Sequence, residues 1–145
     1  MDFVAIHAQT KPDALAQVEG DRRLTWRELL ERRNRLANSL VKQGVGRGEH
    51  VIIYAPNSLE YLLASAATRA ANAVPIPMNH RLVAEEASYI LEHSDAVAAF
   101  VGGPYLAMAG EVRSHAPRVR LWITLGAERR PWDRPRCRES ASAPT

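Results

Sequence analysis

The sequence predicts an open α/β fold, with a mostly parallel sheet flanked by helices. Apolar runs short enough for strands alternate with amphipathic segments long enough for crossover helices. The run Val51-Ile52-Ile53 lacks polar alternation, which is typical of a strand covered on both faces. Pro75 and Pro77 cannot donate to a ladder, so their strand is expected at an edge of the sheet or where pairing ends. The expected strands are 50–54, 73–77, 97–101 and 121–125.

Composition is that of an ordinary water-soluble chain. The 145 residues are 46% hydrophobic and 24% charged, and the formal net charge is only +3, which demands no nucleic-acid partner. A single cysteine, Cys137, allows no internal disulfide. No basic segment followed by an apolar run opens the chain, and polar residues or prolines interrupt its apolar stretches before about 18 residues. We therefore expect no signal peptide, no membrane span and a cytoplasmic location.

The chain divides near Gly126 into a folded part, residues 1–126, and a tail, residues 127–145. The tail holds five arginines and three prolines with almost no aliphatic residues, so we expect it to be disordered. It is either a basic arm for an acidic partner or a solvated segment without function. Its three acidic residues dilute the charge and favour the second interpretation.

The helix at 26–43 has the most complete signals. Thr25 is its expected N-cap and Glu28 the reciprocal partner of a capping box, while Gly44 is the expected C′ glycine. Before it we expect a short helix near 2–9 and a hairpin turning at Glu19-Gly20-Asp21, with Gly20 at positive φ. An apolar stripe at helical spacing joins Trp26, Leu29, Leu30, Leu36, Ala37, Leu40 and Val41.

Three further helices are expected at 58–71, 84–93 and 104–115. Asn57 is a candidate cap for the first, with Glu60 three residues on. His80, His93 and His115 lack the spacing regularity of a zinc site, so no metal role is assigned.

A basic cluster on helix 26–43 has two interpretations. Arg32, Arg33 and Arg35 suggest nucleic-acid binding, but Glu28 and Glu31 each stand four residues before an arginine. This arrangement favours a salt-bridged, solvated face, and we expect no nucleic-acid partner.

The polar run Asn79-His80-Arg81-Leu82 is unusually specific for a surface loop. We expect Arg81 to pair with a carboxylate that fixes the loop. His80 is either a ligand contact or part of a loop capped by its own side chains, and the second interpretation is favoured.

Several short motifs follow one another in a recognisable order. They are Leu24-Thr25-Trp26, Asn34-Arg35-Leu36-Ala37, Gly44-Val45 with Gly48, Pro56-Asn57-Ser58 with Glu60, the two-proline strand, Asn79-x-Arg81-Leu82, and Tyr89-Ile90-Leu91 with Ser94. In this order, over about residues 3–125, they resemble the N-terminal part of the AMP-forming acyl-CoA synthetases, which are adenylate-forming enzymes. The Asn-x-Arg-Leu form looks most like the fatty-acyl or aryl-acid ligases.

The resemblance implies an activity that this stretch lacks the parts to perform. Full-length members use ATP, Mg²⁺ and coenzyme A, and they need a Ser/Thr/Gly-rich phosphate loop ending in Pro-Lys, a ribose-binding aspartate and a C-terminal lysine. Gly102-Gly103 leads into Pro104-Tyr105 without hydroxyls or lysine, and the only lysines, Lys11 and Lys42, stand apart from any glycine-rich loop. No catalytic, cofactor-binding or metal residue is therefore assigned, and no cofactor is expected in this segment.

Two departures from the family pattern bear on stability. Asn72 stands where the family usually has glycine, and asparagine tolerates the left-handed region better than most residues. Val83 stands where Thr or Ser usually opens a helix, and loss of that cap should cost about 1 kcal/mol.

Three hypotheses of function follow. The chain is a truncated relative of ATP-dependent fatty-acid–CoA ligases that is inactive alone, an interaction module that self-associates or docks on a chain carrying the missing portion, or a non-functional frameshift remnant.

Overall fold

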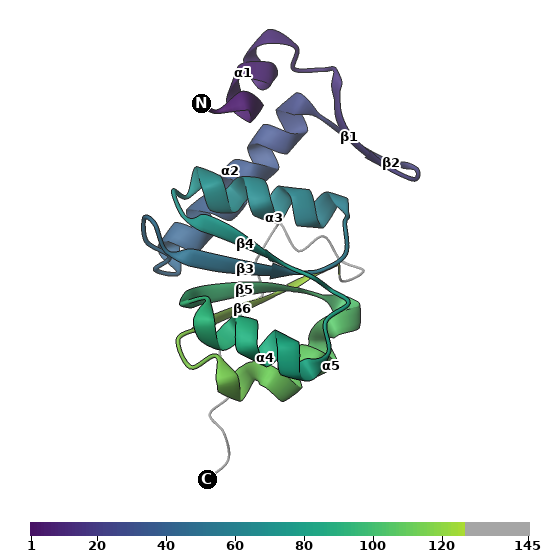
Figure 1. The fold of residues 1–145 in the computed structure, drawn as a ribbon. Helices are drawn as coiled ribbons and strands as arrows, with labels where there is room; N and C mark the ends of the chain where they lie inside the picture. The colour runs from purple at the N-terminus through teal and green to yellow at the C-terminus, as the bar shows by residue number, and fades with distance from the viewer. Residues whose placement is uncertain (127–145) are drawn as a thin grey trace.

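The computed structural model describes residues 1–126, and its centre is a sheet of four parallel strands in the order β4-β3-β5-β6 (Figure 1). The expected open α/β fold is confirmed. β4 lies at an edge, as its two prolines predicted. The strand bounds are β3 His50–Tyr54, β4 Val74–Met78, β5 Ala96–Gly102 and β6 Leu121–Leu125. The tail expected at 127–145 lies outside the described residues.

Helices cover both faces of the sheet. In Figure 1, α2 and α3 lie on one side, and α4 and α5 on the other. The single helix expected at 104–115 is instead a short α-helix between two 3₁₀ turns, and no side chain caps any of the three pieces. The bounds are α2 Trp26–Lys42, α3 Leu59–Ala70, α4 Ala84–His93 and α5 Leu106–Val112, with the turns at Gly103–Tyr105 and Arg113–His115.

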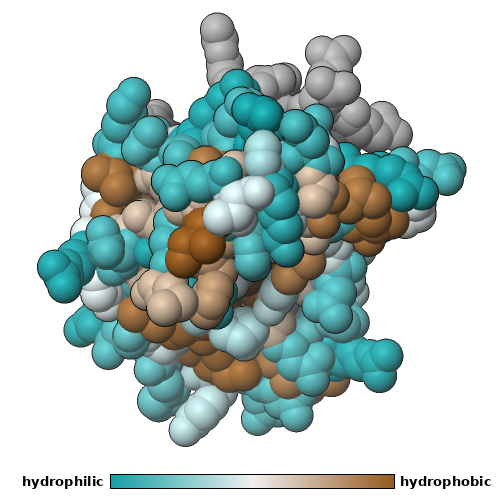
Figure 2. All heavy atoms as spheres, turned by 90° about the horizontal axis from the view of Figure 1, so that it is seen from above, coloured by the Kyte–Doolittle hydropathy of each residue, from teal (hydrophilic) through white to brown (hydrophobic). Residues whose placement is uncertain are grey.

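The N-terminal residues form a separate small layer beyond α2. It consists of α1 (Phe3–Thr10) and a hairpin of β1 (Leu15–Glu19) and β2 (Arg22–Thr25). Gly20 has φ +57° in the hairpin turn, as expected. Figure 2 looks onto this end of the molecule and shows separate apolar patches among polar atoms. The N-terminal layer contributes several exposed apolar side chains, namely Phe3, Ile6, Leu15 and Val18.

Helix α2 has the predicted ends but a slightly rotated buried face. The Thr25 hydroxyl accepts from the Glu28 N–H at 3.3 Å, the Glu28 carboxylate accepts from the Thr25 N–H at 2.9 Å, and Gly44 has φ +88°. Val41 is exposed, whereas Arg33 is 6% exposed and pairs with Asp2 at 2.5 Å. The solvated face expected for the arginine cluster is therefore wrong at Arg33, because α1 covers it. Glu28 bonds to Thr25, and no ion pair joins it to Arg32 within residues 1–126.

Two turn predictions had different outcomes. Asn72 has φ +60°, so asparagine does occupy the left-handed turn before β4. The expected cap at Asn57 is wrong, because Ser58 is the N-cap of α3 and its hydroxyl accepts from the Tyr61 N–H at 3.0 Å. The chain remains extended through Ser58, so the helix begins one residue later than expected.

The core consists of two clusters, one on each face of the sheet. Alternation along β3 sends Val51 and Ile53 toward α2 and α3, and Ile52 and Tyr54 toward α4 and α5. All four side chains are at most 2% exposed, which explains why β3 shows no polar alternation in the sequence.

Candidate functional site at the carboxyl edge of the sheet

The carboxyl ends of all four parallel strands meet at one edge of the sheet (Figure 1). In open α/β sheets, ligands bind in the crevice outside this edge. Here the edge is formed by the turns that follow β3, β4 and β5, at residues 55–58, 79–83 and 103–105. Each turn leads into a helix, so each is a place where exposed N–H groups could hold a phosphate.

An aromatic cluster connects the three turns. The ring of Tyr54, at the end of β3, lies 5.1 Å from the ring of Tyr105, and the His80 ring lies 5.7 Å from Tyr105. The Tyr54 hydroxyl is buried and has no hydrogen-bond partner within residues 1–126. Burial raises the pKa of Tyr54, so this hydroxyl is a neutral group in a largely apolar setting.

The Asn79–Leu82 loop is fixed by its own side chain. Asn79 Oδ1 accepts from the Arg81 N–H at 3.0 Å, which makes an Asx turn. The favoured interpretation, a self-capped loop, agrees with this bond. The expected ion pair of Arg81 is wrong, because its side chain is exposed and no ion pair to it occurs in the described part of the chain. The Asn79 bond already orders the backbone, so the loop does not depend on that pair.

The N-terminus of α3 is closed by the protein's own carboxylate. Glu19, in the hairpin, accepts from the Leu59 N–H at 2.7 Å, and the Ser58 hydroxyl accepts from Tyr61. Glu60 is 7% exposed and is bonded by the Arg22 guanidinium, which also lies 3.7 Å from Glu19. An incoming phosphate would meet two carboxylates here, so this turn does not suit an anion.

The N-terminus of α4 also carries carboxylates, but it is only partly closed. Val83 provides no side-chain cap, as expected, but the Glu86 carboxylate accepts from the Val83 N–H at 3.2 Å. Glu85 and Glu86 both lie in the first turn. Their charges complement the helix dipole and repel an anion from the same position.

Gly102, the last residue of β5, has a packing role. A Cβ at Gly102 would lie 3.1 Å from the Cβ of Ala55 and 3.3 Å from Pro56, so a larger residue would push β5 and the end of β3 slightly apart. Pro104 removes one N–H group from the following turn. Gly102 therefore serves close packing of β5 against the end of β3.

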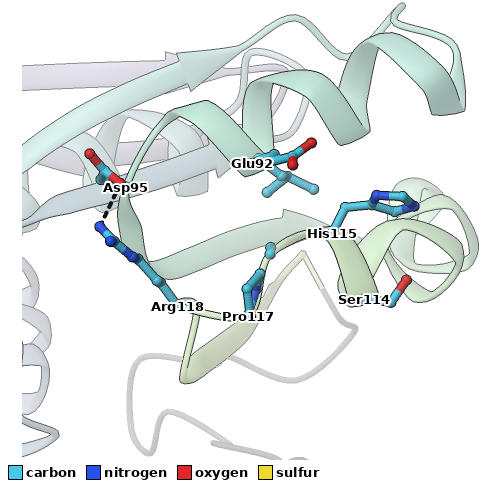
Figure 3. Close-up of a pocket in the computed structure, with 8 residues that line it drawn as sticks. Glu92, Asp95, Ser114, His115, Pro117 and Arg118 are labelled. Carbon is cyan, nitrogen blue, oxygen red and sulfur yellow. Dashed lines mark hydrogen bonds and ion pairs between the residues drawn. The ribbon is translucent and has the colours of Figure 1, made fainter.

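A hollow of about 230 Å³ lies at the opposite, amino edge of the sheet (Figure 3). It separates the end of α4 from the turn before β6, and an Asp95–Arg118 ion pair of 2.6 Å crosses one side. Figure 3 shows Glu92 and His115 facing the hollow from its two walls. Asp95 and Arg118 are both largely exposed, so the ion pair is solvated and the hollow is a shallow surface feature.

Neither a metal cluster nor a membrane-spanning helix occurs within residues 1–126. No three His, Cys, Asp or Glu side chains gather there to hold an ion. The helices in the same range are too short or too polar to cross a bilayer.

Sequence reasoning missed the group that closes α3. Glu19 stands 40 residues before Leu59, and no local pattern joins a hairpin carboxylate to a distant helix. The Asp2–Arg33 pair was missed for the same reason, since its partners are 31 residues apart. In both cases only the fold brings the partners together.

Comparison with known proteins identifies the family to which this chain belongs. The family model described as AMP-binding enzyme matches residues 4–143. The chain therefore belongs to the AMP-binding enzyme family, as the resemblance of its motifs predicted.

Among curated relatives, similarity is to CoA ligases. The chain is 37% identical over 114 residues to a medium/long-chain-fatty-acid–CoA/3-oxocholest-4-en-26-oate–CoA ligase of Mycobacterium marinum, covering 79% of this chain and 21% of that protein. It is 36% identical over 124 residues to a 3-oxocholest-4-en-26-oate–CoA ligase of Rhodococcus rhodochrous, covering 86% and 22%. The chain thus spans about a fifth of the length of these relatives.

Solved structures give the same relationship. A Mycobacterium tuberculosis fatty acyl CoA synthetase is similar with a TM-score of 0.79 and 29% identity, over 84% of this chain and 25% of that one. The N-terminal domain of FACL13 from the same organism is similar with a TM-score of 0.80 and 29% identity, over 84% and 32%. The chain is accordingly a relative of acyl-CoA ligases that matches part of their adenylate-forming domain.

Proposed function

We propose that residues 1–126 are a structural part of an adenylate-forming domain and do not themselves bind the phosphates of ATP. One observation carries the proposal: the strand–helix turns at the carboxyl edge hold the chain's own carboxylates or are taken up by packing. Glu19 accepts from the N-terminus of α3, Glu85 and Glu86 place negative charge at that of α4, and Gly102 packs against Ala55. The phosphates of ATP do not fit these turns, because two of the three present carboxylates that repel an anion.

The complete enzyme to which such a segment belongs would activate a fatty acid. The names of the curated relatives specify fatty-acid and steroid-acid CoA ligases. On this proposal ATP, Mg²⁺ and coenzyme A are used by parts of the domain that correspond to the other four-fifths of those relatives. A role in fatty acid metabolism and a cytoplasmic location belong to the same proposal.

The test is acid-dependent exchange of pyrophosphate into ATP by the purified 145-residue chain. Medium- and long-chain fatty acids serve as substrates, and acyl-CoA formation is followed in parallel. Transfer of phosphoryl and adenylyl groups requires positioned cations and donors, so the expected exchange equals the rate without enzyme. The Mycobacterium marinum ligase, prepared alongside, shows that the assay detects activity.

Robust exchange by this chain alone would overturn the proposal. A second measurement tests nucleotide binding directly, without relying on catalytic activity. Addition of Mg-ATP at millimolar concentration should leave the thermal unfolding midpoint unchanged, because a ligand that does not bind the folded state cannot stabilise it. A clear rise in the midpoint would show a nucleotide site and contradict the proposal.

A further inference from the structure

The two outer strands of the sheet, β4 and β6, differ in a way that matters for association. At one edge, β4 carries Pro75 and Pro77, which cannot donate to an added strand. At the other edge, β6 pairs with β5 on one side only, within residues 1–126. Its sequence Leu-Trp-Ile-Thr-Leu contains no proline, glycine or charge, so it lacks the devices that normally protect an edge strand.

Strand β6 is also complementary to itself. If two copies pair antiparallel about Ile123, Leu121 lies opposite Leu125 of the second copy and Trp122 lies opposite Thr124. Leu121, Ile123 and Leu125 all belong to the core cluster on the α2–α3 side. A two-fold axis perpendicular to the sheet keeps this side in common, so the two apolar clusters would become continuous.

Charge permits the same register. Arg120 falls opposite Gly126 of the second copy, so no like charges face each other across the pair. Arg120 is also already engaged by Glu49 at 3.1 Å and by the Gly44 carbonyl. We propose that β6 is a self-association site at which a second copy of this chain pairs antiparallel about Ile123, giving a closed dimer with one continuous sheet.

The proposal predicts a weak dimer that does not grow further. A five-residue strand spans only about 17 Å, so the paired surface is small and the dissociation constant should be on the order of micromolar or weaker. The prolines of β4 block the opposite edge, so association ends at two copies. Sedimentation of the 145-residue chain over increasing concentration should show a mass that rises from 16.1 kDa toward twice that value. A mass that stays at the monomer, or that grows past the dimer, contradicts the proposal.

A matched pair of lysine variants tests the edge. Thr124→Lys places a charge at a partly exposed position of β6, diagonal to its symmetry copy, and should weaken dimerisation about fivefold or more. Val74→Lys places the same charge at an exposed position of β4 and should leave dimerisation unchanged. Equal effects of the two variants would show general adhesion and overturn the assignment to β6. Circular dichroism establishes that both variants remain folded.

A cysteine pair tests the register itself. With Cys137→Ser as background, Ile123→Cys places two thiols directly opposite each other, where Cα atoms about 5 Å apart allow a disulfide. Thr124→Cys places them diagonally at about 7–8 Å, which is too far to bridge without movement of the backbone. Under mild oxidation only the first variant should form a covalent dimer. Equal cross-linking of the two variants would overturn the proposed pairing. Cross-linking of neither variant would overturn it as well, because another polypeptide would then occupy β6 or the strand would be unpaired.

Discussion

At the scale of single residues, the side chains that hold helix ends are the most informative in this protein. Thr25 and Glu28 satisfy each other's N–H groups at the start of α2. The Thr25 N–H bond is also the main reason that the pKa of Glu28 lies below its ordinary value. This arrangement was predicted from four consecutive residues, because all its partners are local.

Replacement of the cap residue should weaken the whole fold. Thr25→Ala removes the hydroxyl that accepts from Glu28, and we expect it to lower the free energy of unfolding by about 1 kcal/mol. Thr25→Ser retains the acceptor and should cost much less. Urea denaturation of the three proteins measures the difference. An unchanged midpoint for the alanine variant would mean that the cap bond does not contribute.

The Asp2–Arg33 pair should make stability depend on pH. The Arg33 guanidinium, bonded to Asp2, holds the pKa of that carboxyl below its usual range. A depressed folded-state pKa means that the contribution is complete above the unfolded pKa, about 3.9, and is lost as the pH falls through the folded value.

The comparison is between wild type and Asp2→Asn, since asparagine also caps a helix but carries no charge. We expect the wild type to be more stable at pH 6, and this advantage to shrink steadily as the pH is lowered toward 3. Denaturant midpoints across that range provide the measurement. An advantage that stays constant would show that the charge of Asp2 does not contribute.

At the scale of elements, α3 and α4 show two ways to begin a helix after a parallel strand. Helix α3 has a side-chain cap from Ser58 and a carboxylate from the distant hairpin. Helix α4 has Val83 at its cap position and retains only the return bond from Glu86. One N–H bond of a full capping box is therefore missing from α4.

Restoration of that bond should stabilise the protein. Val83 has extended backbone angles of φ −79° and ψ +163°, which suit a capping threonine. Val83 is also 60% exposed, so its methyl groups contribute little burial. We expect Val83→Thr to raise the free energy of unfolding by about 1 kcal/mol. Val83→Ala serves as the control, because it removes the methyl groups without adding an acceptor; an equal gain from alanine would contradict the capping explanation.

At the scale of the whole molecule, the N-terminal layer is attached to the sheet through polar contacts at the start of α3. Glu19 and Arg22 extend from the hairpin to Leu59 and Glu60. Glu60 is nearly buried, so it depends on the guanidinium for its charge-assisted bonds. The same contacts place two carboxylates at the α3 turn, so the groups that attach the hairpin also disfavour an anion there.

Removal of Arg22 should loosen this attachment. Arg22→Ala leaves the buried Glu60 carboxylate without its partner, and we expect a loss of about 1–3 kcal/mol in unfolding free energy. Arg23→Ala removes a neighbouring exposed arginine of the same strand and should change stability by less than about 0.5 kcal/mol. Thermal and chemical unfolding compare the two variants. Equal losses would show that net charge, rather than the Arg22–Glu60 contact, is responsible.

The sequence by itself determined the order of the strands and of most helices along the chain, the α2 capping box and the turn glycines, and it placed β4 either at an edge or where pairing ends. These features depend on neighbours within a few residues or on the chemistry of proline and glycine, so local pattern suffices. The family was also readable from the ordered motifs, and the match over residues 4–143 confirmed it.

Only the tertiary structure decided which groups contact the turns and helix ends around the sheet. The closure of α3 by Glu19, the burial of Arg33 beneath α1 and the packing role of Gly102 all join groups from different elements. Their partners are tens of residues apart, and no local propensity encodes which helix end a hairpin carboxylate will meet. The break of 104–115 into three short pieces has a related cause, since periodicity indicates helix but does not provide the end caps that would keep it continuous.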